Sequence, residues 1–200
     1  MGSGTSSGLE VILNMIEMGA GMKKFVLGFV VGILMIPVGA FGAAWMGWLE
    51  VGARGTPTAM EAVLGHLALD RAAARRSPKV ANPIVPTEEN LMEGMKIFKG
   101  DCAGCHGEPS NAARREAEAI LYPIPPVFAL HPPKKPDEQL FWIIKNGVRY
   151  TGMFWWDGQF GKDATGKDVS DEKIWKTVTF LKHLDSLPPT VAAEWNKKSN

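Results

Sequence analysis

The sequence predicts an all-α protein, and three observations lead to that fold class. Residues 25–49 form one uncharged, mostly apolar run that is long enough for a single membrane-spanning helix. Four later segments carry helix signals, either apolar residues at helical spacing or end caps, and they cover residues 58–76, 87–101, 136–146 and 171–184. No segment shows a convincing strand alternation.

The apolar run is interpreted as a retained anchor. As a helix it would be about 37 Å long at ~1.5 Å per residue, and a bilayer core of ~30 Å needs about 20 residues. Pro37 is tolerable in a membrane helix, and Trp45 and Trp48 fit an interfacial belt. Lys23 and Lys24 precede the run and should stay cytoplasmic, which sends the rest of the chain outward.

A cleaved signal peptide is the alternative to an anchor. Met22 followed by two lysines resembles a natural start, and small residues at 40–44 offer cleavage sites. The apolar run nevertheless exceeds the ~7–15 residues of a signal's apolar region, which favours the anchor.

Residues 58–76 predict an amphipathic helix. Thr58 and Glu61 form a capping box at its start. One face carries four large apolar residues, Met60, Val63, Leu64 and Leu67. Three arginines complement the C-terminal end, either as a solvated helix end or as a basic patch on anionic lipid or an acidic partner. Residues 77–86, with three prolines, predict an extended linker.

The helices of the following domain have clear boundaries. Thr87 is a good N-cap for the helix that leads to Asp101, and Leu91, Met95 and Phe98 mark its buried face. Pro136 at the first position and Gly147 at the end bound a second helix. The helix over 171–184 presents an apolar face and is ended by two prolines, and residues 110–121 are a weaker helix candidate.

The two cysteines of the chain lie together in the run Cys102-Ala103-Gly104-Cys105-His106. This C-x-x-C-H spacing is the attachment signature of a c-type haem. Two thiols two residues apart can each join one vinyl group of a porphyrin, while the adjacent imidazole of His106 reaches the iron from the same side. A zinc half-site, a thioredoxin-like dithiol and a structural disulfide are the alternatives. Zinc would need about four ligands and the sequence has no second Cys/His cluster, while a thioredoxin-like dithiol would need a βαβ pattern, so the haem is favoured over all three.

Three motifs follow one another along the chain. The first is the helix at 89–98 that runs into Cys102, the second is residues 144–153, and the third is the C-terminal helix at 174–181. With its motifs in this order, the stretch 87–188 resembles a class I cytochrome c domain. The resemblance implies that the first and last helices cross beside the haem, with Gly94 and Phe98 at the contact. It also implies haem attachment outside the bacterial cytoplasm.

The resemblance further implies that Met153, in the second motif, is the distal iron ligand opposite His106. It implies that a proline carbonyl orients His106, and Pro123, Pro125 and Pro126 are all candidates. One departure is that Phe154 follows the methionine, where the family commonly has proline.

The other candidate side chains have weaker claims. His131 is the rival sixth ligand, although a surface or propionate-contacting histidine fits it better. Arg149 and Tyr150 could contact propionates. Residues 157–168 are rich in Gly and Asp but do not fit an EF-hand, and they are interpreted as a surface loop.

These observations predict an electron-transfer protein rather than an enzyme. One covalently attached haem c with His106 and Met153 as iron ligands would leave no open position for a substrate. We therefore expect a single-pass cytochrome in the cytoplasmic membrane with its haem domain on the periplasmic side. Expected partners are redox proteins, or a larger respiratory or photosynthetic complex that holds the chain as a fixed subunit. An open-site haem enzyme or gas sensor is the remaining alternative.

The charge balance gives no sign of a nucleic-acid partner. Lys and Arg number 22 against 21 Asp and Glu, so the chain lacks the basic excess of a nucleic-acid protein. No small-molecule substrate is expected either.

Two hundred residues hold an anchor and one domain of about 100–120 residues. The expected parts are 1–21, a tag or upstream extension; 22–49, the transmembrane anchor; 50–86, the amphipathic helix and linker; 87–190, the haem domain; and 191–200, a tail.

Overall fold

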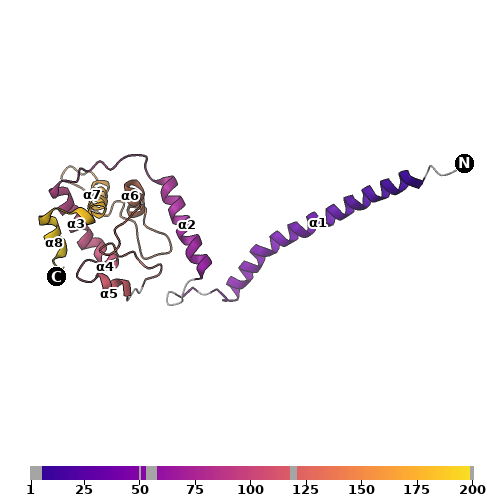
Figure 1. The fold of residues 1–200 in the computed structure, drawn as a ribbon, viewed down its shortest axis with the longest axis horizontal. Coiled ribbons are helices and arrows are strands. Elements are labelled where there is room, and N and C mark those ends of the chain that lie inside the picture. Colours follow the sequence, from indigo (N-terminus) through magenta and orange to yellow (C-terminus); the bar gives the residue numbers. More distant parts are fainter. Residues whose placement is uncertain (1–5, 50, 53–57, 118–120, 199–200) are drawn as a thin grey trace. The chain divides into compact units, whose positions relative to one another are not determined.

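The computed structural model describes residues 6–49, 51–52, 58–117 and 121–198, and it confirms the all-α prediction. The chain divides into two compact units, Met1–Gly52 and Ala53–Asn200. Helices make up both units (Figure 1), and the only strand-like pairing among the described residues is an isolated bridge between Lys162 and Asp168.

The first unit consists mainly of α1, Ser6–Trp45. Its part from Gly21 to Trp45 has a mean hydropathy of 2.3 and is long and apolar enough to cross a membrane. Pro37 lies inside this helix without ending it. None of the apolar window is buried against protein, as expected of a helix whose surroundings are lipid. The sequence predicted an anchor from residue 22 to residue 49. The helix instead begins before residue 22 and ends at Trp45.

The second unit begins with α2, Ala59–Arg76, whose predicted cap is present. The Thr58 hydroxyl accepts a hydrogen bond from the backbone N–H of Glu61 at 3.2 Å. The helix packs on α6, Asp137–Asn146, with Ala73 fully buried, and its Asp70 pairs with Lys135. Small alanines allow this close approach, so the helix packs through a side that the apolar periodicity did not single out.

The segment after α2 is irregular, as predicted, but it is fastened to the domain. The side-chain amide of Asn82 donates to the Thr179 hydroxyl at 2.9 Å and to Asp137 at 3.2 Å. Ile84 packs against the hydrophobic core. These contacts join the segment to two later helices, so it is not a free spacer.

The core forms where α3, Glu88–Ile97, crosses α7, Ser170–Lys182. The Thr87 hydroxyl caps α3 by accepting from the N–H of Asn90 at 3.2 Å. The predicted inner faces are buried, namely Leu91 and Met95 in α3 with Phe98 directly after it, and Ile174, Trp175, Val178 and Leu181 in α7. A Cβ added at Gly94 would lie 2.1 Å from the carbonyl oxygen of Lys176, so only glycine permits this crossing.

Helix α6 packs against α7 through an aromatic stack. The rings of Phe141 and Trp175 lie 4.1 Å apart and nearly parallel, with an angle of 13°. Gly147 ends α6 with a φ of 66°, as its predicted capping role requires. Pro136 is the N-cap and not the first helical residue, and α7 gives way to the short 3₁₀ turn η2, Leu184–Ser186.

Residues 191–196 of the predicted tail are instead part of the domain. Residues Pro189–Asn196 form α8, because Pro189 at the first position starts a new helix and does not merely end α7. Val191 and Trp195 are buried, and the Trp195 ring meets the ring of Phe98 edge-on at 5.7 Å. The domain therefore extends beyond residue 190.

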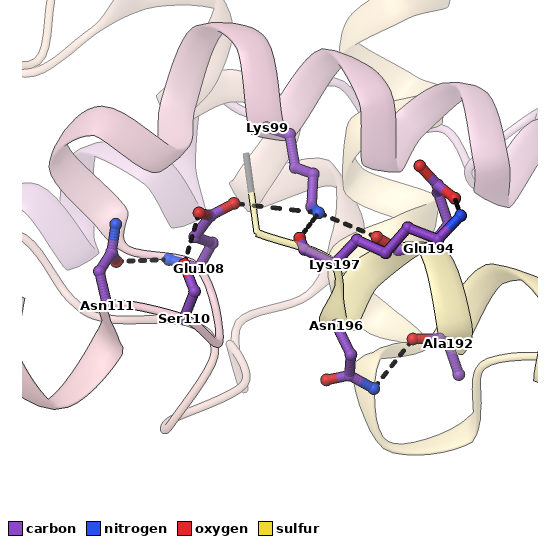
Figure 2. A network of polar contacts seen from close by, with 8 residues as sticks. All are labelled: Lys99, Glu108, Ser110, Asn111, Ala192, Glu194, Asn196 and Lys197. Carbon is purple, nitrogen blue, oxygen red and sulfur yellow. Dashed lines mark hydrogen bonds and ion pairs between the residues drawn. The ribbon is translucent and has the colours of Figure 1, made fainter. Parts of the chain in front are cut away.

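Lys99 secures the C-terminal end of α8 (Figure 2). Its ammonium group donates to the carbonyl oxygens of Glu194 at 2.9 Å and Lys197 at 2.5 Å, and it lies 3.9 Å from the Glu108 carboxylate. A cation at this position satisfies the last carbonyls of the helix. Since Glu108 follows the C-x-x-C-H run, Lys99 connects the last helix to the predicted haem site.

The crossing at Gly94 yields a stability prediction. Gly94→Ala should lower the free energy of unfolding by about 2 kcal/mol, because the added methyl overlaps backbone that cannot move without separating α3 from α7. Urea unfolding in detergent, followed by tryptophan fluorescence, measures the change. Gly100→Ala is the matched control, since its Cβ meets nothing within 4 Å. Equal midpoints for the two variants would contradict the packing argument.

Candidate haem-binding site

The C-x-x-C-H run follows directly from α3. One π-helical turn, η1 at Phe98–Cys102, joins that helix to the single turn α4, Ala103–His106. Gly107, with a φ of 72°, ends the turn. Cys102 is half-buried and Cys105 is exposed, and neither is in a disulfide. Both thiols and the imidazole thus lie on one short element anchored at Phe98, which is itself fully in the core.

His106 is held in a defined orientation. Its Nδ1 lies 2.9 Å from the carbonyl oxygen of Pro126. A carbonyl only accepts, so Nδ1 carries the proton and Nε2 keeps its lone pair. The His106 ring stacks on Phe128 at 4.8 Å and 15°, and the Phe128 N–H donates to the His106 carbonyl at 3.3 Å. Of the three prolines that the sequence left open, Pro126 makes the contact.

The acid–base state of His106 suits a ligand of haem iron. Burial lowers the pKa of His106, against the raising effect of the Pro126 hydrogen bond, which favours the neutral imidazole that a metal requires. Burial, followed by the charges of Asp101 and Cys105, raises the pKa of Cys102 to about 12. Among the described residues, no three His, Cys, Asp or Glu side chains gather as a metal-binding group.

The loop that carries Met153 is closed by its own backbone. The N–H of Val148 donates to the Met153 carbonyl at 2.9 Å, and the Thr151 hydroxyl accepts from the Met153 N–H at 3.0 Å. A Cβ on Gly147 would lie 2.7 Å from the same Met153 carbonyl, so the loop passes very close to the end of α6. Tyr150, at the loop tip, has a left-handed φ of 64°, the kind of strain found at functional loops.

Residues from both parts of the predicted haem site pack against one hydrophobic core. Cys102, Phe128 and Met153 are all half-buried side chains packed against it. The loop that contains Leu121 approaches the loop that carries Met153, since a Cβ on Gly152 would lie 3.4 Å from the side chain of Leu121. The structure therefore places the C-x-x-C-H element and the Met153 loop around the same core, while ligation by Met153 stays a prediction.

Three large apolar side chains on these loops are exposed, as suits a large apolar cofactor. Ile124 is 60% exposed, Phe154 54% and Trp155 58%. Large apolar side chains left exposed are often found at binding surfaces. Together with two free thiols and an imidazole with an available Nε2, these side chains fit a covalently attached haem. The sequence pointed to the aromatics after Met153 but missed Phe128, whose contact with His106 is a tertiary one.

The other histidines have contacts of their own or are exposed. The Nε2 atom of His131 is 2.8 Å from Glu116, and 67% of the His131 side chain is exposed. His183 contacts the carbonyl of Thr179 at 2.7 Å, and His66 is exposed on α2. Arg149 is exposed, and its predicted propionate contact stays a prediction.

The predicted surface loop at 157–168 is exposed in the structure except at Phe160, which packs against the core. Its first residue, Asp157, lies 3.4 Å from the ammonium group of Lys145, which also pairs with Asp171 at 2.7 Å. Asp163 accepts hydrogen bonds from Thr165, including one from its hydroxyl at 2.6 Å. Its carboxylate thus organises a turn.

A comparison with known protein families supports the assignment of a haem-binding site. Residues 89–181 match the family described as cytochrome c oxidase, cbb3-type, subunit III. No curated protein and no solved structure shows a significant match to the chain. The matched family is a c-type haem-binding domain, and the matched residues include both cysteines, His106 and Met153. Because the chain has one attachment motif and no further cysteine, it is a monohaem c-type cytochrome behind an apolar N-terminal helix.

Proposed function

We propose that this haem-based electron carrier passes single electrons between redox proteins at the outer face of the membrane that α1 spans. The observation that supports it best is the fixed orientation of His106, whose Nδ1 is held by the Pro126 carbonyl. When bound, the haem supplies the one-electron couple between ferrous and ferric iron. The chain's own residues hold it covalently through Cys102 and Cys105 and present Nε2 to its iron.

If His106 and Met153 both held the haem iron, no position would be open for a substrate, which favours electron transfer over catalysis. Pro126 and Phe128 prevent His106 from rotating, and the Pro126 hydrogen bond raises its basicity as a ligand. On the other side, the Thr151 hydroxyl fixes the backbone of Met153. A thioether ligand favours ferrous iron relative to a second imidazole, so Met153 would set a high potential. A rigid pair of ligands also reduces the rearrangement that accompanies each electron.

The charge pattern supports an outward-facing haem domain. Lys23 and Lys24 lie at the N-terminal side of the apolar stretch and are exposed. Positive residues next to a membrane helix stay on the cytoplasmic side. The haem domain, on the other side of the span, would then lie outside, where c-type haem is attached in the family that the sequence resembles.

A fixed place in a larger membrane complex is the second candidate, and the family match favours it, since the matched family is described as an oxidase subunit. Purification in mild detergent separates the two candidates. A free carrier should migrate as a lone chain, whereas a fixed subunit should bring the same partner chains in constant proportion through successive columns.

Met153 provides the sharpest test of the carrier against an open-site enzyme or sensor. If it ligates the iron, the ferric protein should show the weak sulfur-to-iron charge-transfer band at the red end of the visible spectrum. Met153→Ala should abolish the band and let carbon monoxide bind the ferrous iron readily. Met153→His should keep the iron six-coordinate but lower its potential.

Met92→Leu is the matched control, because Met92 is also half-buried against the core and should leave the spectrum unchanged. If His131→Ala opens the iron and Met153→Ala does not, the haem has two histidine ligands. Rapid carbon monoxide binding by the wild-type ferrous protein would instead favour an open-site enzyme or sensor.

Thr151 should act through Met153. Thr151→Val keeps the side-chain shape but removes the oxygen that accepts from the Met153 N–H. Thr151→Ser keeps that oxygen. We expect the valine variant, and not the serine variant, to bind carbon monoxide several-fold faster in the ferrous state, because the sulfur leaves the iron more often. Stopped-flow mixing measures the rate, and equal rates in both variants would show that the hydroxyl does not position Met153.

The anchor can be tested by fractionation. With Gly21–Trp45 long enough to span, the protein should stay with membranes through salt and alkaline washes and leave them only in detergent. Its mature N-terminus should lie before Phe25. A mature chain that starts near Ala43 and is soluble in the periplasm would replace the anchor by a signal peptide and leave the haem assignment intact.

A further inference from the structure

The outward side of α2 is apolar. Met60 is 72% exposed, Val63 64%, Leu64 56% and Leu67 49%. Because residues three and four apart lie on one side of a helix, the four form a continuous patch about 10 Å long at ~1.5 Å per residue. This patch is called the α2 apolar stripe. Four large apolar side chains exposed in one row are typical of an interaction surface.

The domain fixes the direction of the stripe. Helix α2 is held from another side, through the buried Ala73, its packing on α6 and the ion pair between Asp70 and Lys135. The helix therefore cannot rotate to bury Leu64 or Leu67 without losing those contacts. The stripe is a permanent outer surface of the second unit.

The charges around the stripe identify its occupant. Arg71 and Arg75 are exposed and continue the row from Leu67 in steps of four residues. The two carboxylates nearest in sequence, those of Glu61 and Asp70, lie off this row, and the Asp70 carboxylate is already paired with Lys135. An apolar row that ends in two guanidinium groups suits the boundary of an anionic bilayer, where the apolar side chains enter the acyl region and the arginines reach lipid phosphates.

If α1 spans a membrane, the chain keeps α2 within reach of that membrane. The candidate span ends at Trp45 and α2 begins at Ala59. Residues 46–58 between them reach at most about 45 Å when fully extended. Trp48 in this stretch is 72% exposed, and tryptophan favours the membrane interface. A surface tethered this closely meets lipid at a high effective concentration, so even a short stripe can dock.

We propose that the α2 apolar stripe lies in the headgroup–acyl boundary of the anionic membrane that α1 spans, and that it thereby orients the haem domain toward its redox partners. This inference rests on the anchored state in the proposed function. Through α6, the docked helix would fix which side of the haem domain faces away from the bilayer.

Spin labelling of the full chain tests the proposal. Haem attachment consumes Cys102 and Cys105, so only an introduced thiol reacts. Leu64→Cys is labelled on the stripe, and Ala164→Cys is labelled in the exposed loop between α6 and α7 as the control. Each haem-loaded protein is placed in nanodiscs of phosphatidylcholine and phosphatidylglycerol that contain no other membrane protein. The electron spin relaxation caused by dissolved oxygen is then compared with that caused by a water-soluble nickel chelate.

We expect oxygen to relax the label at 64 several-fold more than the nickel chelate does, and the reverse at 164. Equal access of the nickel chelate to both positions would overturn the proposal. Protection at 64 in native membranes but not in these nanodiscs would show that a protein covers the stripe, and it would also overturn the lipid assignment. A chain that does not enter the nanodiscs at all would contradict the anchor itself and, with it, the docking.

The two arginines allow a second, independent test of the lipid assignment. Arg71→Glu with Arg75→Glu should reduce the oxygen preference at position 64 several-fold in nanodiscs with phosphatidylglycerol. The same pair should have little effect in nanodiscs of phosphatidylcholine alone, where the attraction to anionic lipid is absent. Both residues are exposed, so the absorption spectrum of the haem should be unchanged. An equal effect in the two lipids would contradict an electrostatic role.

Discussion

The close crossing of α3 and α7 at Gly94 is the contact on which the rest of the haem domain depends. With no side chain at Gly94, the backbone of Lys176 reaches the first helix, and Phe98 enters the core one turn later. Phe98 also begins the π-helical turn that leads into Cys102. The position of the haem-attachment residues is therefore set by helix packing, and the flexibility of the loops has little part in it. In addition, Lys176 pairs with Glu93 at 2.7 Å across the same crossing.

Two loops hold the predicted site residues by different means. Pro126 and Phe128 contact His106 from another part of the chain. The Met153 loop is closed by local hydrogen bonds, because Thr151 and Val148 bind the backbone of Met153 within a few residues, and the Met153 side chain also packs against the core. The orientation of His106 is thus coupled to the global fold, whereas the shape of the Met153 loop is set largely within the loop itself.

The sequence predicted the elements whose signals are local. Thr87 caps α3 and Gly147 ends α6 through contacts within a few residues, so both boundaries could be inferred without the fold. The C-x-x-C-H spacing indicated its chemistry for the same reason. Pro126 could not be distinguished from its neighbouring prolines, because the choice depends on how the chain returns to His106. The helix that contains Trp195 was missed, since two successive prolines end one helix and also begin the next.

The burial of Trp195 has a consequence for the order in which the protein matures. Its ring closes the core over Phe98 and Phe180, yet it lies near the C-terminal end of the chain. Because a polypeptide is synthesised N-terminus first, this core cannot close until Trp195 has been made. The attachment motif, by contrast, is made much earlier, and Cys105 remains exposed even in the finished fold. The two thiols therefore become accessible to haem attachment before the core around Phe98 can close.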